Sequence, residues 1–431
     1  MSERRQMRLG YLRRHAGPFL TIGVVSVLGI GATAAFHALT GRGLGPGAFG
    51  LLAAFLSIVN IAAIGASSLQ NAVAVATARA VTEAAETAEA AETAGGVVAE
   101  RRPRWWDSAN IEAISLGGAG ALAVGLLAPL LASQLSTSRL AVYLAALTIV
   151  PSFMFSVAQG RLQGVGRANA VAGWSTSSQI LRVALAAAAL AAGLGAVSVL
   201  VAVLLAIAAV AVAAAWQVRG TRLPGTVRAF SSHSIVLIML TLSFAWLTSI
   251  DVMLVRIGAA ETDAGMFAAA AVLAKMLLIV PTTLSLYLLP RFVNRQGDRV
   301  TTRFGVNVVL LAVLGSGLVG VLAMALVGRF LIALFFGQGY EGAVQMLPWL
   351  SLAYLPWALA QGLLIRLTAV VSRLTLGLLL AAAVVQWVVA RIVLPDLNAM
   401  IAVIGILGSV VAALMFVLHA THSRDVGVPN A

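Results

Sequence analysis

Twelve long apolar runs are the feature that most constrains the fold of this chain. Each is about 20 residues long, the length that an α-helix needs to cross the hydrocarbon core of a bilayer. The runs lie at 18–39, 50–78, 111–134, 138–159, 169–191, 195–216, 234–257, 264–288, 304–327, 342–365, 374–394 and 398–419. We therefore predict an all-α integral membrane protein with about twelve transmembrane helices, because a helix satisfies its own backbone hydrogen bonds in lipid.

The composition narrows the function classes. Of the 431 residues, 61% are hydrophobic and only 10% are charged, whereas the surface of a soluble protein requires far more charged residues. This excludes a soluble enzyme, a disordered chain and a nucleic-acid-binding domain, although the net charge is +13. The chain has no cysteine, and its five histidines are scattered without metal-ligand spacing. We expect no metal and no cofactor.

The arginines predict the orientation of the spans, since basic residues favour the cytoplasmic side of a membrane. With the N-terminus in the cytoplasm, most arginines fall in inside segments. The predicted outside loops and outer helix ends hold one arginine each, and these are Arg42, Arg139, Arg256, Arg329 and Arg391. The pattern predicts that both termini are cytoplasmic. The basic N-terminus is then the start of the first membrane helix rather than a cleaved signal peptide.

The chain is expected to divide into two halves of six helices. Residues 1–216 form the N-terminal lobe, which includes an acidic cytoplasmic segment at 79–110; residues 217–233 form a cytoplasmic linker, and residues 234–431 form the C-terminal lobe. Residues 47–50 and 265–268 are similar segments that precede the second helix of each half. Arg42 and Arg256 end the first helices. These matches predict parallel repeats around a central cavity, as in secondary transporters, unless they are coincidence in a Gly/Ala-rich sequence.

Polar side chains inside the spans are the candidates for a functional site, because they are costly in lipid unless they face a cavity or a partner. In the second span Asn60 and Asn71 belong to one polar stripe, and in the fifth span Gln179 and Arg182 belong to another. Arg182 and Lys275 lie deep in their spans. The predicted substrate-cavity residues are Arg42, Arg182, Asp251, Arg256, Lys275, Asn60, Asn71 and Gln179.

Two interpretations of the charged residues remain open. The seventh and eighth spans are antiparallel neighbours, so Lys275 is within reach of Asp251, and the two could form a structural pair that only neutralises buried charge. In the functional interpretation, they belong to a charged cavity that meets an anionic head group or carries a proton. A single acid against two deep cations and the rim residues Arg42 and Arg256 leaves an excess of positive charge. This favours an anionic ligand such as a phosphate.

The sequence contains no pattern that indicates catalysis. The glycine-rich segment at 41–47 lacks the Lys-Ser/Thr of a P-loop and follows a membrane helix rather than a strand. A Ser-His-Asp set, an HExxH motif and paired acids at a membrane face are also missing. We therefore expect that the chain is not an enzyme and has no catalytic residues.

Several short segments resemble bacterial polysaccharide flippases. Residues 41–50, GRGLGPGAFG, are similar to the "AR-x-LGP-x-x-FG" segment of those proteins, and residues 163–167, QGVGR, to their "LQG-x-GR" turn. Residues 249–292 resemble the start of their second half, where Asp251, Arg256, Gly265, Lys275 and Pro290 stand at positions that recur. Residues 335–340 are also similar. The chain thus resembles the lipid-linked oligosaccharide flippase family of the multidrug/oligosaccharidyl-lipid/polysaccharide exporter (MATE-like) superfamily.

This resemblance implies two six-helix bundles around a central cavity, alternating access, and a location in the bacterial cytoplasmic membrane. The implied substrate is a polyprenyl-pyrophosphate-linked oligosaccharide or a similar glycan precursor. The implied partners are that glycan, membrane lipids, a coupling ion (H⁺ or Na⁺) and other polysaccharide-assembly proteins, with no nucleic acid. Two alternatives remain: a cation-coupled multidrug antiporter of the same superfamily, and a membrane-embedded enzyme of cell-surface polysaccharide synthesis.

Overall fold

The computed structural model describes residues 3–93, 107–219, 232–279, 299–369 and 373–425. Within these ranges the regular structure is helical throughout, without a strand. The elements are α1 (Glu3–Thr93), α2 (Ser108–Leu126), α3 (Ala128–Gln134), α4 (Arg139–Gly164), α5 (Ala168–Ala191), α6 (Ala196–Arg219), α7 (Ser232–Gly258), α8 (Glu261–Ala274), the 3₁₀ segment η1 (Lys275–Leu278), α10 (Arg299–Phe335), α11 (Glu341–Ala369), α12 (Arg373–Val393) and α13 (Leu397–Asp425).

The predicted all-α fold class is confirmed. α1 consists of two helices that meet at Gly45, whose backbone is non-helical (φ 72°, ψ 172°). Glycine adopts a positive φ without steric cost, and Pro46 can start the second helix because the first residue of a helix needs no hydrogen-bonded N–H. With α1 counted as two helices and α2 with α3 as one interrupted helix, the described residues hold the twelve predicted helices.

Nine helices in the described ranges are long and apolar enough to cross a membrane, and α1 counts among them as a single long helix. Helix α5 is not among the nine because its polar residues lower its hydropathy, and α8 is only 14 residues long. Together with the helical fold, these apolar helices make the chain a multi-pass membrane protein.

Several predicted spans differ from the observed helices. The second span continues as a helix to Thr93, because alanine and glutamate, which dominate this extension, are strong helix formers. The third span is interrupted at Leu127, since Pro129 has no N–H for the helical ladder. The eighth span changes from α-helix to 3₁₀-helix at Lys275. Its end at 280–288, most of the linker and residues 94–106 of the acidic segment lie outside the described residues.

By its internal contacts the chain forms two compact units, and they are not simply its two halves. Unit 1 contains residues 1–40, 66–130 and 138–230, and unit 2 contains residues 41–65, 131–137 and 231–431. Unit 2 therefore includes two segments from the first half of the sequence. The predicted lobe boundaries at 216 and 234 stay a prediction.

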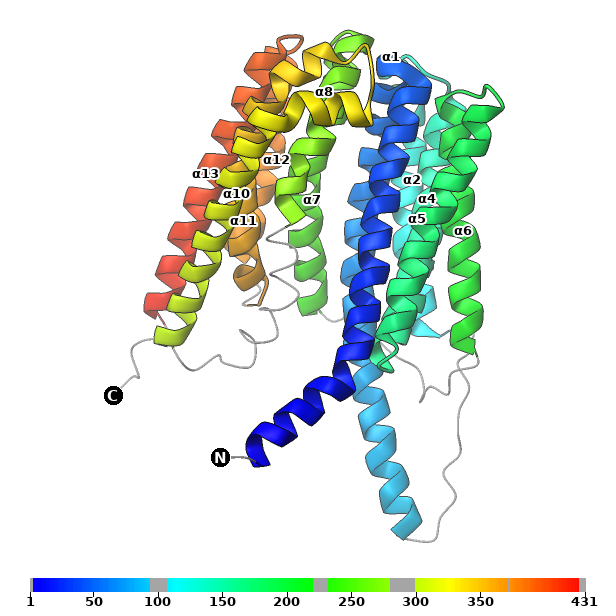
Figure 1. Ribbon diagram of the computed structural model, residues 1–431, viewed down its shortest axis with the longest axis vertical. Coiled ribbons are helices and arrows are strands. Elements are labelled where there is room, and N and C mark those ends of the chain that lie inside the picture. Colours follow the sequence, from blue (N-terminus) through cyan, green and yellow to red (C-terminus); the bar gives the residue numbers. More distant parts are fainter. Residues whose placement is uncertain (1–2, 94–106, 220–231, 280–298, 370–372, 426–431) are drawn as a thin grey trace. The chain divides into compact units, whose positions relative to one another are not determined.

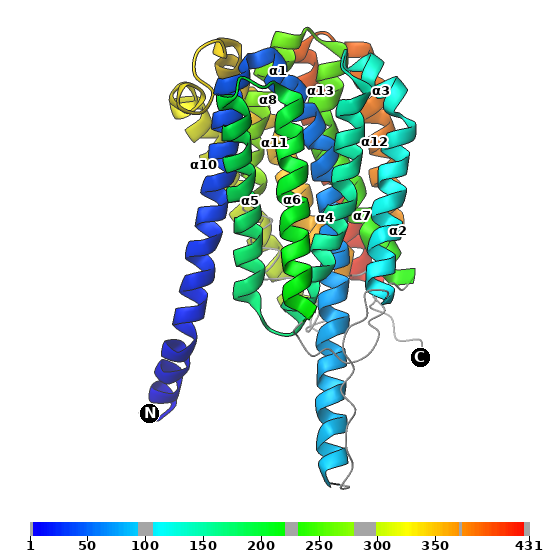
Figure 2. The ribbon, with the colours of Figure 1, turned by 90° about the vertical axis from the view of Figure 1, so that its right-hand side faces the viewer.

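In unit 1, helices α4, α5 and α6 pack side by side (Figure 2). Their apolar faces meet in a core to which α4 contributes Phe155 and Leu162 and α6 contributes Ile207 and Val210. Trp174 of α5 packs against this core, and its indole Nε1 donates a hydrogen bond of 2.6 Å to Gln217 Oε1 of α6. These contacts determine which face of α5 packs against α4 and α6.

Helix α11 is the central helix of unit 2 and packs against α8, α10 and α13 (Figure 1). Trp357 in α11 is fully buried, and its Nε1 donates to the carbonyl oxygen of Ile404 in α13 at 3.0 Å. The ring of Phe244 in α7 meets the Trp357 ring edge to face at 6.0 Å. One aromatic side chain thus connects three helices.

The similar segments at 47–50 and 265–268 pack against each other within unit 2. A β-carbon at Gly50 would lie 2.8 Å from the backbone nitrogen of Gly265. A β-carbon at Gly265 would lie only 1.9 Å from the carbonyl oxygen of Pro46. The second helix of α1 and α8 can approach this closely only because both crossing residues lack a side chain.

Candidate functional site

Asp251 is the centre of a charged cluster in unit 2. Its side chain projects from α7 and the residue is 0% exposed. One carboxylate oxygen, Oδ1, lies 2.8 Å from the Nζ of Lys275, and the other, Oδ2, accepts a hydrogen bond from the hydroxyl of Tyr354 in α11. The Lys275 ammonium also lies 5.4 Å from the centre of the Tyr354 ring. The predicted reach of Lys275 to Asp251 is confirmed.

The cluster carries one negative and one positive charge, so Asp251 and Lys275 neutralise each other. Both oxygens of the carboxylate have a donor, which offsets the cost of burying it. The side chain of Lys275 is 23% exposed, whereas that of Asp251 is 1% exposed. Lys275 is therefore the member of the pair that a ligand or solvent can reach, and it lies where α8 changes into a 3₁₀ turn.

Arg182 forms a different kind of site in unit 1. It lies in α5, and among the described residues no carboxylate is within ion-pair distance of its guanidinium. The guanidinium carbon is 5.8 Å from the centre of the Phe36 ring in α1, and His37 is close enough to interact electrostatically with it. The Nε of Arg182 and the Oε1 of Gln179, one turn earlier in α5, are buried without a hydrogen bond.

A half-buried cation with an unused buried donor favours an anionic ligand, because a guanidinium that is partly shielded from water gains from a carboxylate or phosphate that accepts its N–H groups. The ring of Phe36 compensates only part of the lost hydration. In contrast, two buried cations in the described ranges have acidic partners: Arg161 pairs with Asp107, and Arg256 pairs with Glu261. Arg182 therefore differs from them in having only an aromatic and a histidine beside it.

The polar face of α5 meets polar and backbone groups of two other helices in unit 1. Gln159 of α4 donates through Nε2 to the hydroxyl of Ser175 in α5 at 2.7 Å. In α5 the hydroxyl of Thr176 donates to the carbonyl oxygen of Val25 in α1 at 2.8 Å. These hydrogen bonds join α5 to its neighbouring helices, as hydroxyls between membrane helices commonly do. Gln179 and Arg182, further along α5, take part in neither bond.

The two predicted rim arginines have different roles in unit 2. Arg42 is exposed, and its Nη2 donates to the carbonyl oxygens of Ala333 at 3.1 Å and Leu334 at 2.5 Å, at the end of α10. It therefore satisfies carbonyls that the helix end leaves without partners. Arg256 is buried and donates to Glu261 Oε1 at 2.7 Å, while its Nε and Nη1 are buried without a hydrogen bond.

The remaining predicted residues are two exposed asparagines. Asn60, in the part of α1 that belongs to unit 2, donates through Nδ2 to the hydroxyl of Ser249 in α7 at 3.3 Å. Asn71, further along α1, belongs to unit 1 and is exposed. The structure thus brings Asp251 together with Lys275, and Gln179 together with Arg182. Among the described residues, no hydrogen bond or ion pair joins the exposed Asn71 to another predicted site residue.

Tyr354, Phe36 and Asp107 are contact residues that the sequence prediction missed. A tyrosine hydroxyl inside the tenth span was the available signal for Tyr354, because such a group needs a partner in lipid. Phe36 and Asp107 carried no comparable signal. Within the described ranges, no three His, Cys, Asp or Glu side chains gather where they could hold a metal ion.

Comparison with solved structures shows the fold. The structure of a multidrug resistance MATE family transporter of the MOP superfamily, in an inward-facing conformation, matches with a TM-score of 0.69 and 15% identity over 94% of this chain and 100% of that one. An outward-facing structure of the same description matches with a TM-score of 0.64 and 15% identity, over 95% of this chain and 96% of that one.

A MOP superfamily transporter from Pyrococcus furiosus, described as having a binding pocket of reverse polarity that suggests a different function, matches with a TM-score of 0.66. Its identity is 16%, over 95% of this chain and 96% of that one. No protein-family model and no curated protein matches the chain. The chain has the fold of MATE transporters, and at these identities the likeness extends to the fold alone.

Proposed function

We propose that this chain is a transporter that moves an anionic, polyprenyl-pyrophosphate-linked oligosaccharide or a similar glycan precursor across the bacterial cytoplasmic membrane by alternating access. The shared fold supports transport, because the similar structures are transporters. The substrate class rests mainly on one observation: Arg182 in α5 is a half-buried cation whose buried Nε has no hydrogen bond, and it has no carboxylate partner in the described residues.

In this proposal, the phosphates of the substrate accept hydrogen bonds from the guanidinium of Arg182, and Gln179 contributes its amide beside it. Within unit 2, the ammonium of Lys275 is the cation of the Asp251–Lys275 pair that a phosphate can reach, since its side chain is partly exposed. Polar residues such as Asn60 and Asn71 meet the sugars, and both termini lie in the cytoplasm. The chain itself catalyses no reaction, and a coupling ion, H⁺ or Na⁺, supplies the driving force.

The second candidate is a multidrug antiporter, which the descriptions of two similar structures favour. A drug that is an organic cation needs an acidic group within its site. In the described residues, the deep acid Asp251 already has Lys275 and Tyr354 as partners. The contacts of Arg182 and Asp251 therefore support an anionic substrate more than a cationic one.

Ligand binding to the purified full-length protein separates the two candidates. We expect undecaprenyl pyrophosphate to raise the melting temperature, and ethidium to leave it unchanged. Arg182→Ala should weaken pyrophosphate binding by about 10- to 100-fold, because a hydrogen bond to a charged group contributes about 1.5–3 kcal/mol. Arg391→Ala is the matched control, since Arg391 is an exposed arginine bonded to Gln134.

Transport is then measured in proteoliposomes with a fluorescent undecaprenyl-pyrophosphate-linked disaccharide, whose outer-leaflet copies are quenched by dithionite. We expect the wild type and Arg391→Ala to move the probe between leaflets, and Arg182→Ala to lose this activity while it still inserts into the membrane. Stabilisation by ethidium together with equal pyrophosphate binding by wild type and Arg182→Ala would overturn the proposal in favour of drug transport.

A further inference from the structure

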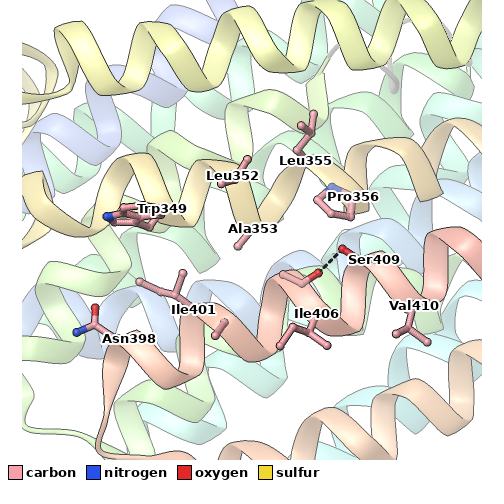
Figure 3. Close-up of a pocket in the computed structure, with 12 residues that line it drawn as sticks. Trp349, Leu352, Ala353, Leu355, Pro356, Asn398, Ile401, Ile406, Ser409 and Val410 are labelled. Atoms are coloured by element: carbon pink, nitrogen blue, oxygen red, sulfur yellow. Dashed lines mark hydrogen bonds between the residues drawn. The ribbon is translucent and has the colours of Figure 1, made fainter.

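An elongated groove of about 710 Å³ runs along the seam between α11 and α13 in unit 2 (Figure 3). It lies apart from Asp251 and Lys275 and shares no residue with that cluster. The groove opens sideways, because two residues that line it, Trp349 in α11 and Ile406 in α13, are each 65% exposed. Its size is within the range of about 300–1,000 Å³ that is usual for small-molecule sites.

Tight packing beneath the groove gives it a fixed floor. A β-carbon at Gly405 would lie 3.4 Å from Ala353, so α11 and α13 nearly touch there. On the buried side of the seam, Trp357 holds the two helices together through its hydrogen bond to Ile404. Ala402, Gly405 and Ser409 follow one another on one face of α13 and are small. The open volume above them is therefore built into the helix pair.

The polarity of the groove changes along its length. Figure 3 shows Trp349 and Asn398 at the same end, and both side chains carry N–H donors. Leu352, Ile406 and Val410 line the rest with hydrocarbon. The hydroxyl of Ser409 adds no free donor, because it donates to the carbonyl oxygen of Gly405 in its own helix at 2.8 Å. The groove has one end with polar donors and a long apolar body.

The length of the groove matches one leaflet of a bilayer. From Asn398 to Val410 the helix α13 rises about 18 Å at 1.5 Å per residue, and half of a hydrocarbon core is about 15 Å. Both flanking helices are among those apolar and long enough to span a membrane. A groove on the side of these helices therefore opens into the hydrocarbon core of the bilayer. Because unpaired polar groups are costly there, the occupant of its apolar part has to be a hydrocarbon chain.

We propose that this groove binds one acyl chain of a bilayer phospholipid, whose ester and phosphate oxygens accept hydrogen bonds from Trp349 and Asn398. The donors at one end match the ester and phosphate oxygens of a phospholipid. These oxygens lie at the membrane–water interface, where tryptophan is enriched. The apolar body matches the length of a single acyl chain. The site is independent of the transported substrate, so it stands whether or not the proposed function is correct.

Native mass spectrometry of the full chain tests this proposal. The protein is purified from vesicles of phosphatidylethanolamine and phosphatidylglycerol that contain undecaprenyl phosphate at an equal mole fraction. We expect one phospholipid per chain to remain bound under activation that removes other lipids. The double variant Ala402→Leu/Ser409→Leu fills the groove from exposed positions and should reduce the retained phospholipid at least tenfold.

Gly315→Leu is the matched control, because Gly315 is exposed on α10 and a β-carbon there meets nothing within 4 Å. It should retain the phospholipid as the wild type does. Equal retention by all three proteins would overturn the site, and retention of undecaprenyl phosphate instead of phospholipid would overturn the assigned occupant. A dimer mass that the double variant abolishes would show that a second copy of the chain covers the groove, which also contradicts the proposal.

Discussion

Gly265 lies so close to Pro46 that a β-carbon at position 265 would stand 1.9 Å from the carbonyl oxygen of Pro46. The obstacle is backbone rather than a flexible side chain, so the helices would have to separate to admit a methyl group. The neighbouring Gly47 has more room, since a β-carbon there would lie 3.6 Å from Glu261. At this helix crossing, position 265 has no space for a β-carbon, whereas position 47 can hold one in ordinary van der Waals contact.

Gly265→Ala is therefore expected to lower the free energy of unfolding by about 1–3 kcal/mol, the usual effect of overpacking. Gly47→Ala should change it little, because an alanine methyl fits there in ordinary contact and favours the helix. Thermal unfolding of the purified proteins in one detergent measures both. A melting temperature of Gly265→Ala equal to that of Gly47→Ala would contradict the close approach.

Lys275→Met should destabilise the protein by up to about 3–5 kcal/mol, because it leaves the buried carboxylate of Asp251 without its cation. The partial exposure of Lys275 puts the expected value at the lower end. Adding Asp251→Asn should recover much of that loss, since the remaining charge is then removed as well. The double-mutant cycle measures this coupling between the two residues. Additive effects of the two substitutions would show that they do not form an energetic pair.

Tyr354→Phe keeps the ring but removes the hydroxyl that donates to Asp251. Because a hydrogen bond to a charged group contributes about 1.5–3 kcal/mol, we expect a loss of stability of that order. Tyr143→Phe is the control, since Tyr143 is 47% exposed on α4. If Tyr354→Phe were as stable as Tyr143→Phe, the hydroxyl would not be a partner of the carboxylate.

Arg182→Met and Arg161→Met should differ in their effects on stability. Arg182 has no acidic partner in the described residues, so replacing it by an apolar side chain should leave the melting temperature unchanged or raise it. Arg161 pairs with the buried Asp107, and its replacement should cost about 3–5 kcal/mol. Denaturation of the two variants beside the wild type measures this difference. A large loss of stability in Arg182→Met would assign Arg182 a structural role.

Tyr340 predicts a loss of stability at alkaline pH. It precedes α11 outside the spanning segments, its hydroxyl donates to the carbonyl oxygen of Gly41 at 2.8 Å, and burial raises its pKa above the ordinary value. The folded protein therefore keeps this proton at a pH where the unfolded chain loses it. The contribution of the Tyr340 hydroxyl to the free energy of unfolding is therefore complete below about pH 10, and it falls as the pH rises further. Tyr340→Phe should remove that part of the pH dependence of the melting temperature.

The sequence predicted the features that depend on local pattern. The apolar runs located the helices because hydropathy and length decide what crosses lipid, and the neighbouring spans of Asp251 and Lys275 predicted their pairing. Tyr354 is more than 100 residues away from Asp251 along the chain, and no local pattern indicates that contact. Arg161 carries no local signal for a partner either, and its pairing with Asp107 depends on the packing of α4 against α2.

The Asp251–Lys275 pair has a consequence for ion selectivity. A dissolved cation can reach the Oδ1 of Asp251 only by competing with an ammonium that is attached to the same chain. A tethered group acts at an effective concentration in the millimolar range or above, without depending on the solution outside. A dissolved cation therefore has to displace the Lys275 ammonium before it binds Oδ1 of Asp251, and the access of ions to this oxygen depends on the position of Lys275.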